Sequence, residues 1–424
     1  MFVNYLDYFE VRDNSLFLDY RNLVELGKKY GTPLIIYSKR KIRENVKRLK
    51  DAFNVDFLSI KFAIKSNFNP SILSILKDMD LGFDAANLNE VLLALRVGND
   101  QDKVIASPNN LSRDELIKIS ELGVTLNFDD IKQMEVIGNH LPEVVSFRVN
   151  PGIGKGEFAG ITTGGKGSKF GIPPDIANLA YKTAKERGCK RFGIHMMSGS
   201  NVLEPSFFKQ SSKIFFSIAE RIAKDNNIEF EFLDLGGGLG VPYRPNEEEL
   251  DIRTVARYIL DNFEESHSRG FFKGSKLVLE PGRFIIANAG VMLATVTNVK
   301  NYDDLIIGTD ASMNSLIRIP LYGAVHPVLV ANKASEPVKV RGNIAGQVCE
   351  NTDILFKSVS VPEIEVGDTI AILNSGAYVS SMASNYNLIK RPMELLLDGS
   401  NETIIRREEN LDDMLATFTS VTQH

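Results

Sequence analysis

The chain has 424 residues, a formal net charge of −5 and 24% charged residues. This acidic balance argues against a nucleic-acid-binding protein, which carries a basic face, and the length suits an α/β barrel with a smaller second domain. We expect neither a membrane-spanning helix nor an N-terminal signal segment, because no run of residues has the required pattern. Two cysteines are too few for a disulfide framework and fit a reducing cytoplasm, and five scattered histidines predict no metal site.

Short β-forming runs alternate with helical patterns over most of the chain. The eight predicted strands are residues 58–65, 81–85, 103–107, 124–128, 144–149, 191–198, 230–235 and 276–280. Helical patterns such as Leu88 to Val97 and Ser206 to Asp225 lie between most of them. Crossovers of this length allow parallel pairing, so the pattern predicts a (β/α)8 barrel, an α/β fold. The glycine-rich connection at residues 150–172 is too long for a plain loop, and we expect it to be functional.

The pattern changes after about residue 285. Runs such as Val291 to Val299 and Thr369 to Leu373 resemble strands without helices between them, and Pro33 to Tyr37 near the N-terminus is similar. We therefore predict a barrel over residues 38–284 and a mainly β second domain formed by residues 1–37 and 285–424.

Lys65 stands at the end of the first predicted barrel strand, before a predicted turn. The catalytic groups of such barrels lie at the carboxyl ends of strands. A lysine amine that is desolvated in a pocket there loses its proton more easily and can form a Schiff base. A lysine that simply extends into solvent is the alternative. Other chemistry-bearing groups also fall at strand ends, which favours a shared site: Asp84, Arg148, His195 to Ser200, Gly236 to Gly238, and Glu280 to Arg283.

A glycine loop follows the seventh predicted strand at Gly236-Gly237-Gly238. Its backbone amides could hold a phosphate, because glycine lets the backbone approach closely. The spacing is not that of a dinucleotide fingerprint, and an ordinary tight turn is the alternative.

Glu280-Pro281-Gly282-Arg283 follows the eighth predicted strand. A buried glutamate could pair with a protonated pyridine nitrogen, and Gly282 and Arg283 could add phosphate or carboxylate contacts. An ion pair between Glu280 and Arg283 within the turn is the alternative.

A lysine for an imine, a glycine loop for a phosphate and a glutamate for a ring nitrogen together describe a pyridoxal-phosphate site. On these residues the chain resembles the fold-type III pyridoxal-phosphate-dependent decarboxylases, and among them the diaminopimelate decarboxylases most. The resemblance runs from about Tyr30 to Leu415. Its further motifs are Phe62 to Asn67, Arg148-Val149-Asn150-Pro151, Ser168-Lys169-Phe170-Gly171, Met313-Asn314, Cys349-Glu350, Gly376-Ala377-Tyr378 and Arg391-Pro392.

The resemblance implies a role for each matching residue. Lys65 would form the Schiff base with pyridoxal 5'-phosphate, and Cys349, donated by the partner subunit, would protonate the reacting carbon. The implied cofactor-binding residues are Lys65, Asp84, Ser200, Gly236, Gly237, Gly238, Glu280, Gly282, Arg283 and Tyr378. The implied substrate-binding residues are Arg283, Arg318, Tyr322, Glu350 and Tyr378. These roles require a homodimer that shares its active sites.

Three of these residues have structural alternatives. Asp84 could equally be a surface charge. Cys349 could be a small buried apolar residue. Arg318 lies in an apolar run and needs an anion, for which a substrate carboxylate and a structural salt bridge are both candidates.

The chain departs from the family pattern at several positions. Met197 stands where the family has a histidine that stacks on the cofactor ring, and its sulfur could pack there instead. His195 lies two residues earlier, one layer deeper. Asn351-Thr352 replaces a pair of small residues. These changes put the substrate in question more than the reaction.

We predict a pyridoxal-phosphate-dependent decarboxylase, with meso-diaminopimelate as the substrate and L-lysine as the product. A related amino acid or carrier-bound intermediate of secondary metabolism, such as a siderophore or antibiotic precursor, is the alternative substrate. A non-catalytic protein of cofactor homeostasis would lack the second β domain and the Cys-Glu pair. A racemase of the alanine racemase type would need a tyrosine in the role of Cys349.

Overall fold

The computed structural model describes residues 8–157, 164–165 and 167–419. Part of the predicted functional connection at 150–172 therefore lies outside the described residues. The chain forms two compact units. The barrel unit comprises Arg43–Pro242 and Glu248–Ile285, and the β unit comprises Met1–Ile42, Tyr243–Glu247 and Ile286–His424. The predicted domain limits at residues 38 and 284 stay a prediction.

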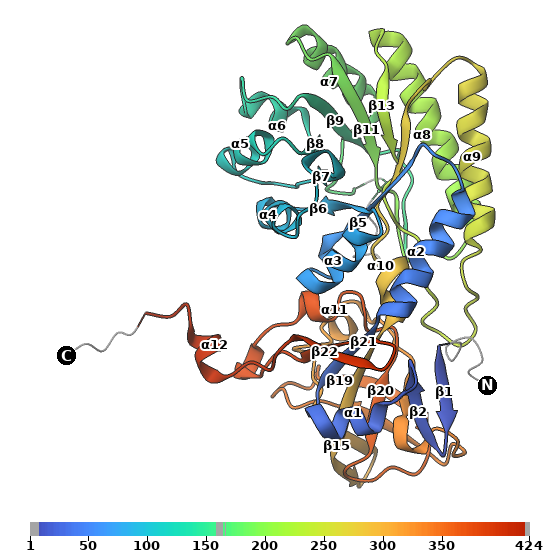
Figure 1. The fold of residues 1–424 in the computed structure, drawn as a ribbon, viewed down its shortest axis with the longest axis vertical. Coiled ribbons are helices and arrows are strands. Elements are labelled where there is room, and N and C mark those ends of the chain that lie inside the picture. The colour runs from blue at the N-terminus through green and yellow to red at the C-terminus, as the bar shows by residue number, and fades with distance from the viewer. Residues whose placement is uncertain (1–7, 158–163, 166, 420–424) are drawn as a thin grey trace. The chain divides into compact units, whose positions relative to one another are not determined.

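The barrel unit is built on eight parallel strands that close into a ring. In chain order they are β5 (Leu58–Ala63), β6 (Gly82–Ala85), β7 (Val104–Ala106), β8 (Thr125–Phe128), β9 (Val144–Val149), β11 (Arg191–Met196), β13 (Phe230–Asp234) and β14 (Lys276–Leu279). Figure 1 labels those from β5 to β13. Because β14 pairs with β5, the predicted (β/α)8 barrel is confirmed. The first strand ends at Ala63, so Lys65 lies in the 3-10 turn η1 (Ile64–Ser66) rather than in the strand.

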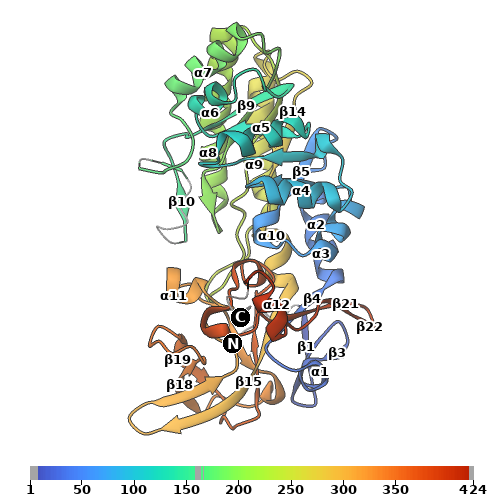
Figure 2. The ribbon, with the colours of Figure 1, turned by 90° about the vertical axis from the view of Figure 1, so that its left-hand side faces the viewer.

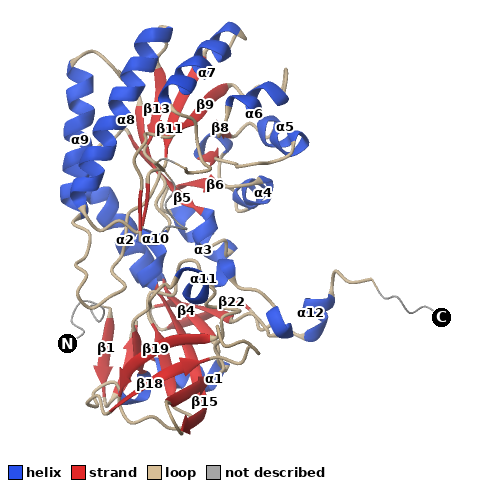
Figure 3. Cartoon of the chain, turned by 180° about the vertical axis from the view of Figure 1, so that it is seen from behind, coloured by secondary structure: helices blue, strands red, loops and turns tan. Residues whose placement is uncertain are grey.

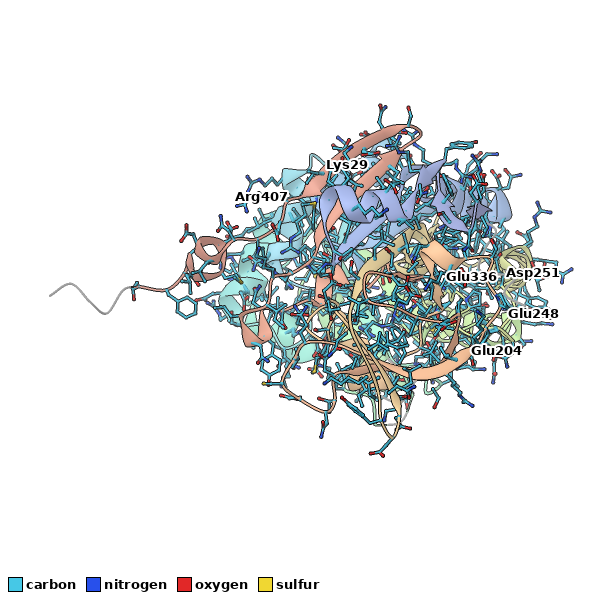
Figure 4. The ribbon with its side chains drawn as sticks, turned by 90° about the horizontal axis from the view of Figure 1, so that it is seen from below. Lys29, Glu204, Glu248, Asp251, Glu336 and Arg407 are labelled. Atoms are coloured by element: carbon cyan, nitrogen blue, oxygen red, sulfur yellow. The ribbon has the colours of Figure 1, made fainter. Side chains whose placement is uncertain are left out.

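Helices alternate with these strands, as Figure 2 shows for the α4 to α9 region. They are α2 (Lys39–Phe53), α3 (Pro70–Asp78), α4 (Leu88–Arg96), α5 (Arg113–Glu121), α6 (Ile131–Val136), α7 (Pro174–Glu186), α8 (Pro205–Asn226), α9 (Ile252–Ser268) and α10 (Arg283–Ile286). Their starts follow from local chemistry. The Ser112 hydroxyl accepts the Glu115 N–H in a capping box at α5. Asp251, labelled in Figure 4, accepts the Thr254 N–H at the start of α9.

The interior of the barrel changes from apolar to charged along the strands. Ile105, Phe232 and Val278 form a buried apolar cluster. Residues two positions further along a strand point to the same side, and there the chain has Asp234 and Glu280, both buried. The site is therefore a charged layer at the carboxyl ends of the strands, supported by apolar packing beneath it.

The β unit contains a nine-stranded sheet, drawn in red in Figure 3. Its strands are β4 (Leu34–Ser38), β15 (Gly290–Asn301), β16 (Leu305–Thr309), β17 (Val328–Val330), β18 (Val340–Ala345), β19 (Ile354–Val361), β20 (Thr369–Ile372), β21 (Met393–Asp398) and β22 (Asn401–Arg406). β4, from the N-terminal segment, pairs with both β15 and β21. The prediction of a mainly β second domain is confirmed, although β17, β19, β21 and β22 were not predicted individually. β22 is mostly exposed, so it lacks the apolar alternation that identifies a strand in sequence.

Three short sheet strands and three helices complete the described β unit. They are β1 (Phe9–Arg12), β2 (Ser15–Leu18), β3 (Arg21–Asn22), α1 (Leu23–Tyr30), α11 (Arg318–Tyr322) and α12 (Leu411–Leu415). Buried side chains from β2, α1, β4, β15 and β21 form one core cluster. In the described part of the chain, no helix is long and apolar enough to cross a membrane.

Candidate active site

Lys65 and Asp84 form an ion pair at the carboxyl ends of two neighbouring strands. η1 continues β5 and places the Lys65 amine 2.5 Å from Asp84 Oδ2, at the end of β6. Asp84 is buried, and burial followed by the charge of Glu280 raises the pKa of its carboxyl, which Lys65 opposes. The Lys65 side chain is 43% exposed. The amine is therefore held by a buried carboxylate at the barrel mouth rather than desolvated in a pocket.

Glu280 belongs to a buried trio with His195 and Asp234. His195 Nε2 lies 3.2 Å from Glu280 Oε2, and since a carboxylate only accepts, the histidine donates. One ligand atom from each of the three residues lies within 4.8 Å of the others. Such a trio could also hold a metal ion, so a metal-free site stays a prediction.

The charges within this trio are unequal. Burial alone would raise the pKa of Glu280. The charge and hydrogen bond of His195, together with the charge of Lys65 and a contact with Asp234, outweigh burial and lower this pKa overall. Burial and the charge of Glu280 raise the pKa of Asp234 well above its ordinary value. The pKa of Glu280 is therefore below its ordinary value and that of Asp234 is above it, so Glu280 is the stronger acid of the two. Among the described residues, Glu280 Oε1 has no hydrogen-bond partner and remains available as an acceptor.

The glycine loop after β13 is in contact with the neighbouring strand ends. Gly236 accepts a hydrogen bond from the Glu280 N–H at 2.7 Å. A Cβ on Gly237 would lie 2.4 Å from the Glu280 carbonyl oxygen, so no other residue fits there without a backbone shift. The loop is therefore packed against Glu280, whose Oε1 has no hydrogen-bond partner among the described residues.

Met197 contacts this loop through its sulfur, which accepts the Gly237 N–H at 3.1 Å. Thioether sulfur is a weak acceptor. A stronger acceptor such as a phosphate oxygen can therefore replace the sulfur as the hydrogen-bond partner of the Gly237 N–H. The contact of Met197 with a cofactor ring stays a prediction.

The remaining predicted cofactor residues of the barrel unit lie on adjacent segments. Ser200 is in the short strand β12 (Gly199–Ser200), which pairs with β10 (Lys155–Gly156). Gly238 accepts the Val202 N–H just after β12. Gly282 packs against Ser66 of η1, and Arg283 begins α10 and is buried. The alternative predicted from sequence was an ion pair between Glu280 and Arg283, whereas the structure shows Glu280 paired with His195.

These residues fit pyridoxal phosphate. The cofactor needs an amine for its aldehyde, an acceptor for its ring N–H and donors for its phosphate. Lys65 offers the amine and Glu280 Oε1 the anionic acceptor, which is otherwise an orphaned buried atom. The glycine loop offers the Gly237 N–H, whose partner among the described residues is the Met197 sulfur.

Cys349 and Glu350 lie together on an exposed loop of the β unit. Buried Asp353 shapes the loop by accepting the backbone N–H groups of Met313 and Val348 at 2.6 and 2.7 Å. Cys349 is exposed, so the alternative of a buried apolar cysteine is wrong. Tyr378 lies elsewhere in the β unit with a left-handed φ of 59°. Such a backbone in a bulky residue is often found at functional sites.

Arg318 is buried in the β unit at the start of α11, four residues before Tyr322. His326 Nε2 lies 3.3 Å from its Nη1 and accepts its N–H, because His326 Nδ1 donates to the Leu373 carbonyl oxygen at 2.9 Å. The Tyr243 ring lies 5.3 Å from the guanidinium carbon. No carboxylate of the described residues forms an ion pair with Arg318, so the alternative of a structural salt bridge is not supported there.

Several residues of these sites were not predicted from sequence. Asp234 and His326 are brought in by pairing between distant segments. Tyr386 and Asn387, which contact Glu350 and Cys349, lie in a turn without periodic pattern. The alternation along β13 could have indicated Asp234, since it points to the same side as Phe232. No sequence signal points to Tyr386 or Asn387.

Comparison with known proteins agrees with this geometry. Residues 39–287 match the family model described as "Pyridoxal-dependent decarboxylase, pyridoxal binding domain". The chain is 40% identical to a diaminopimelate decarboxylase of Thermoplasma acidophilum over 394 residues, covering 93% of this chain and 94% of the other. It is 37% identical to one of Methanothermobacter thermautotrophicus, covering 96% of each.

Among solved structures, the chain is similar to a diaminopimelate decarboxylase from M. jannaschii in complex with L-lysine. The two share 28% sequence identity, and the TM-score is 0.90 with 98% of each chain covered. The similarity therefore extends over both units of the chain.

Proposed function

The chain belongs to the pyridoxal-dependent decarboxylase family, and from that premise we propose that it converts meso-diaminopimelate to L-lysine and carbon dioxide. Members of this family are pyridoxal-phosphate-dependent carboxy-lyases. The choice of substrate is supported by the two diaminopimelate decarboxylases to which the chain is 40% and 37% identical. It is supported independently by Arg318.

Arg318 is the observation that carries the substrate proposal. A buried guanidinium without an anion is costly, because its lost hydration is not replaced. The contacts shown for Arg318 are a neutral acceptor on His326 and the face of Tyr243. meso-Diaminopimelate brings a distal carboxylate that would form a charge-assisted pair with the guanidinium. L-Lysine and L-ornithine lack that group and would leave the charge unmatched.

We infer the cofactor roles of the barrel unit from its geometry. Bound pyridoxal phosphate would supply an electron sink for the electron pair left by carbon dioxide. Lys65 would attach the cofactor and later exchange with the substrate amine. Glu280, kept anionic by His195, would accept the ring N–H at Oε1. Asp84 would hold the Lys65 amine when it is free.

The phosphate contacts are supported by position alone. They would come from segments that meet at the carboxyl ends of the strands: Ser200, Gly236, Gly237, Gly238, Gly282 and Arg283. Met197 would release the Gly237 N–H to the phosphate and could then pack against the ring.

In the β unit, Cys349 would return a proton to the reacting carbon. Glu350 would bind the distal amine of the substrate, and Tyr322 and Tyr378 would line the same site. We propose that these residues act in a homodimer, in which the Cys349 loop of one subunit completes the site of the other. A cytoplasmic location also stays a proposal, supported by the two free cysteines.

The substrate proposal is tested by measuring carbon dioxide release from meso-diaminopimelate, L-lysine and L-ornithine with purified holoenzyme. We expect turnover of meso-diaminopimelate only. Arg318→Met keeps the length of the side chain and should lower kcat/KM by about 100-fold, because one partner of a buried charged pair is lost. Arg341→Met, on exposed Arg341 of β18, is the matched control. No release from meso-diaminopimelate above that of Lys65→Ala would refute the proposal.

Shared sites are tested with mixed dimers of Lys65→Ala and Cys349→Ala subunits. If each site combines Lys65 of one subunit with Cys349 of the other, one of the two sites in a mixed dimer is intact. Mixing two inactive variants should then restore activity. Continued inactivity of a mixture shown to contain mixed dimers would contradict sharing.

A further inference from the structure

One turn of the β unit contacts both residues proposed to act on the substrate from the Cys349 loop. The turn is η7 (Tyr386–Leu388). Asn387 Nδ2 donates to Cys349 Sγ at 3.1 Å. The Tyr386 hydroxyl donates to Glu350 Oε1 in a short hydrogen bond. We propose that Tyr386 and Asn387 are positioning residues that fix the proton donor Cys349 and the amine-binding Glu350. This inference rests on the proposed function and assigns that function two further residues.

The backbone of the turn is held in an unfavourable conformation. Asn387 has φ 54° and ψ 23°, and Leu388 has φ 57°. Asparagine tolerates the left-handed region, but leucine adopts it rarely because its Cβ is crowded there. The Leu388 side chain is 54% exposed, so packing does not explain this conformation. Conformations of this kind persist where the surroundings impose them, and they are concentrated at functional sites.

The surroundings of the turn do impose it. The Leu388 N–H donates to the Asn385 carbonyl oxygen at 2.8 Å. Asn385 Nδ2 in turn donates to Glu409 Oε2 at 2.8 Å. Glu409 is buried and also pairs with Arg391 and Arg406. The turn is therefore attached to a buried charged cluster, and it presents Tyr386 and Asn387 from a fixed base.

Glu350 is held at both carboxylate oxygens. Tyr386 donates to Oε1, and the Thr352 hydroxyl donates to Oε2 at 3.0 Å. These hydrogen bonds, first that of Tyr386 and then that of Thr352, lower the pKa of Glu350. The carboxylate is thus ionised and oriented, and each oxygen keeps a lone pair for a substrate ammonium group. Thr352 stands where the family pattern has a small residue, so this second donor is a feature of this chain.

The two positioning contacts should have separate kinetic signatures. Tyr386 acts through Glu350, which binds the distal amine, so its loss should weaken substrate binding. Asn387 acts through Cys349, which returns the proton, so its loss should slow product formation after carbon dioxide has left. A purely structural role in the turn would change both parameters together, because both contacts come from consecutive residues.

The test uses Tyr386→Phe and Asn387→Gly in the holoenzyme with meso-diaminopimelate. Glycine keeps the left-handed backbone without strain and removes only the amide. Tyr302→Phe is the control, because Tyr302 is 91% exposed in the same unit. We expect Tyr386→Phe to raise KM about tenfold with kcat within about twofold. We expect Asn387→Gly to lower kcat about tenfold with KM within about twofold.

A single-turnover measurement separates positioning from general damage. In Asn387→Gly, carbon dioxide release should keep the wild-type rate while lysine formation slows. Parallel changes in kcat and KM for both variants, or values equal to those of Tyr302→Phe, would overturn the inference.

An activity-independent measurement distinguishes failure of this inference from failure of the proposed function. The chain has only two cysteines, so in a Cys189→Ala background only Cys349 can be alkylated by iodoacetamide. Asn387→Gly should change the rate of this alkylation at least about threefold, because the amide that contacts the Cys349 sulfur and fixes its position is lost. An unchanged rate would refute the Asn387 contact whatever the substrate is. If the wild-type enzyme releases no carbon dioxide from meso-diaminopimelate, while Asn387→Gly still changes the alkylation rate, the proposed function alone is refuted.

Discussion

Lys61 is a buried amine that the proposed chemistry does not use. It lies on β5, two residues before the strand ends, and its side chain is 5% exposed. Its amine has a long contact of 3.5 Å with the Asp102 carbonyl oxygen. Burial lowers the pKa of Lys61 from 10.5 to about 8, although the charges of Asp234, Asp102 and Glu280 oppose the shift. The protonated amine is therefore a source of instability within the barrel.

The size of this effect follows from the pKa. A fall from 10.5 to about 8 corresponds to about 3 kcal/mol of unfolding free energy lost at pH 7. Between about pH 8 and 10.5 the folded state holds fewer protons on Lys61 than the unfolded state does, so wild-type stability rises with pH there. Lys61→Met keeps the apolar stem and removes the charge. It should stabilise the protein by about 3 kcal/mol at pH 7 and by about 1 kcal/mol at pH 10.

The assay is thermal unfolding of the holoenzyme followed by circular dichroism at both pH values. The expected stabilisation corresponds to a rise in Tm of roughly 3–6 °C at pH 7. Lys276→Met is a matched control, because exposed Lys276 on β14 lines the same cavity of about 300 Å³. It should change stability by less than about 0.5 kcal/mol. A lower Tm for Lys61→Met, or the same gain at pH 7 and pH 10, would show that the amine is not a buried charge.

Three further predictions concern the site and its support. Glu280→Gln should lower kcat/KM by about 100-fold, because an amide cannot remain anionic beside the ring nitrogen; full activity in a steady-state assay would contradict this role. Gly237→Ala should destabilise the protein by about 1–3 kcal/mol, since its Cβ would meet the Glu280 carbonyl oxygen. Gly27→Ala, a helix position with ordinary contacts, should be neutral or stabilising in the same unfolding assay. Tyr181→Phe should cost about 1–3 kcal/mol by urea unfolding, because the buried hydroxyl accepts the Phe147 N–H and donates to the Gly193 carbonyl oxygen; an unchanged midpoint would mean that these groups find other partners.

The sequence by itself determined the elements of the barrel. Eight β-forming runs separated by helical patterns are local signals, because strand and helix periodicity depend on neighbouring residues. These runs also placed Lys65, Asp84 and Glu280 at strand ends, where a barrel brings its catalytic groups together. The exposed strand β22 and the exact end of β5 were missed, because the first lacks alternation and the second depends on the turn η1.

Only the tertiary structure decided which of these groups meet. His195 and Glu280 are 85 residues apart in sequence and share a hydrogen bond, and this contact lowers the pKa of Glu280. The sequence shows Arg318 only as a cation in an apolar run. The folded structure places His326 and the Tyr243 ring beside it, and among the described residues no carboxylate pairs with it. Asn387 reaches Cys349 across 38 residues from a turn with no periodic pattern. Burial and partner identity come from long-range packing, whereas local patterns report only which face a residue occupies.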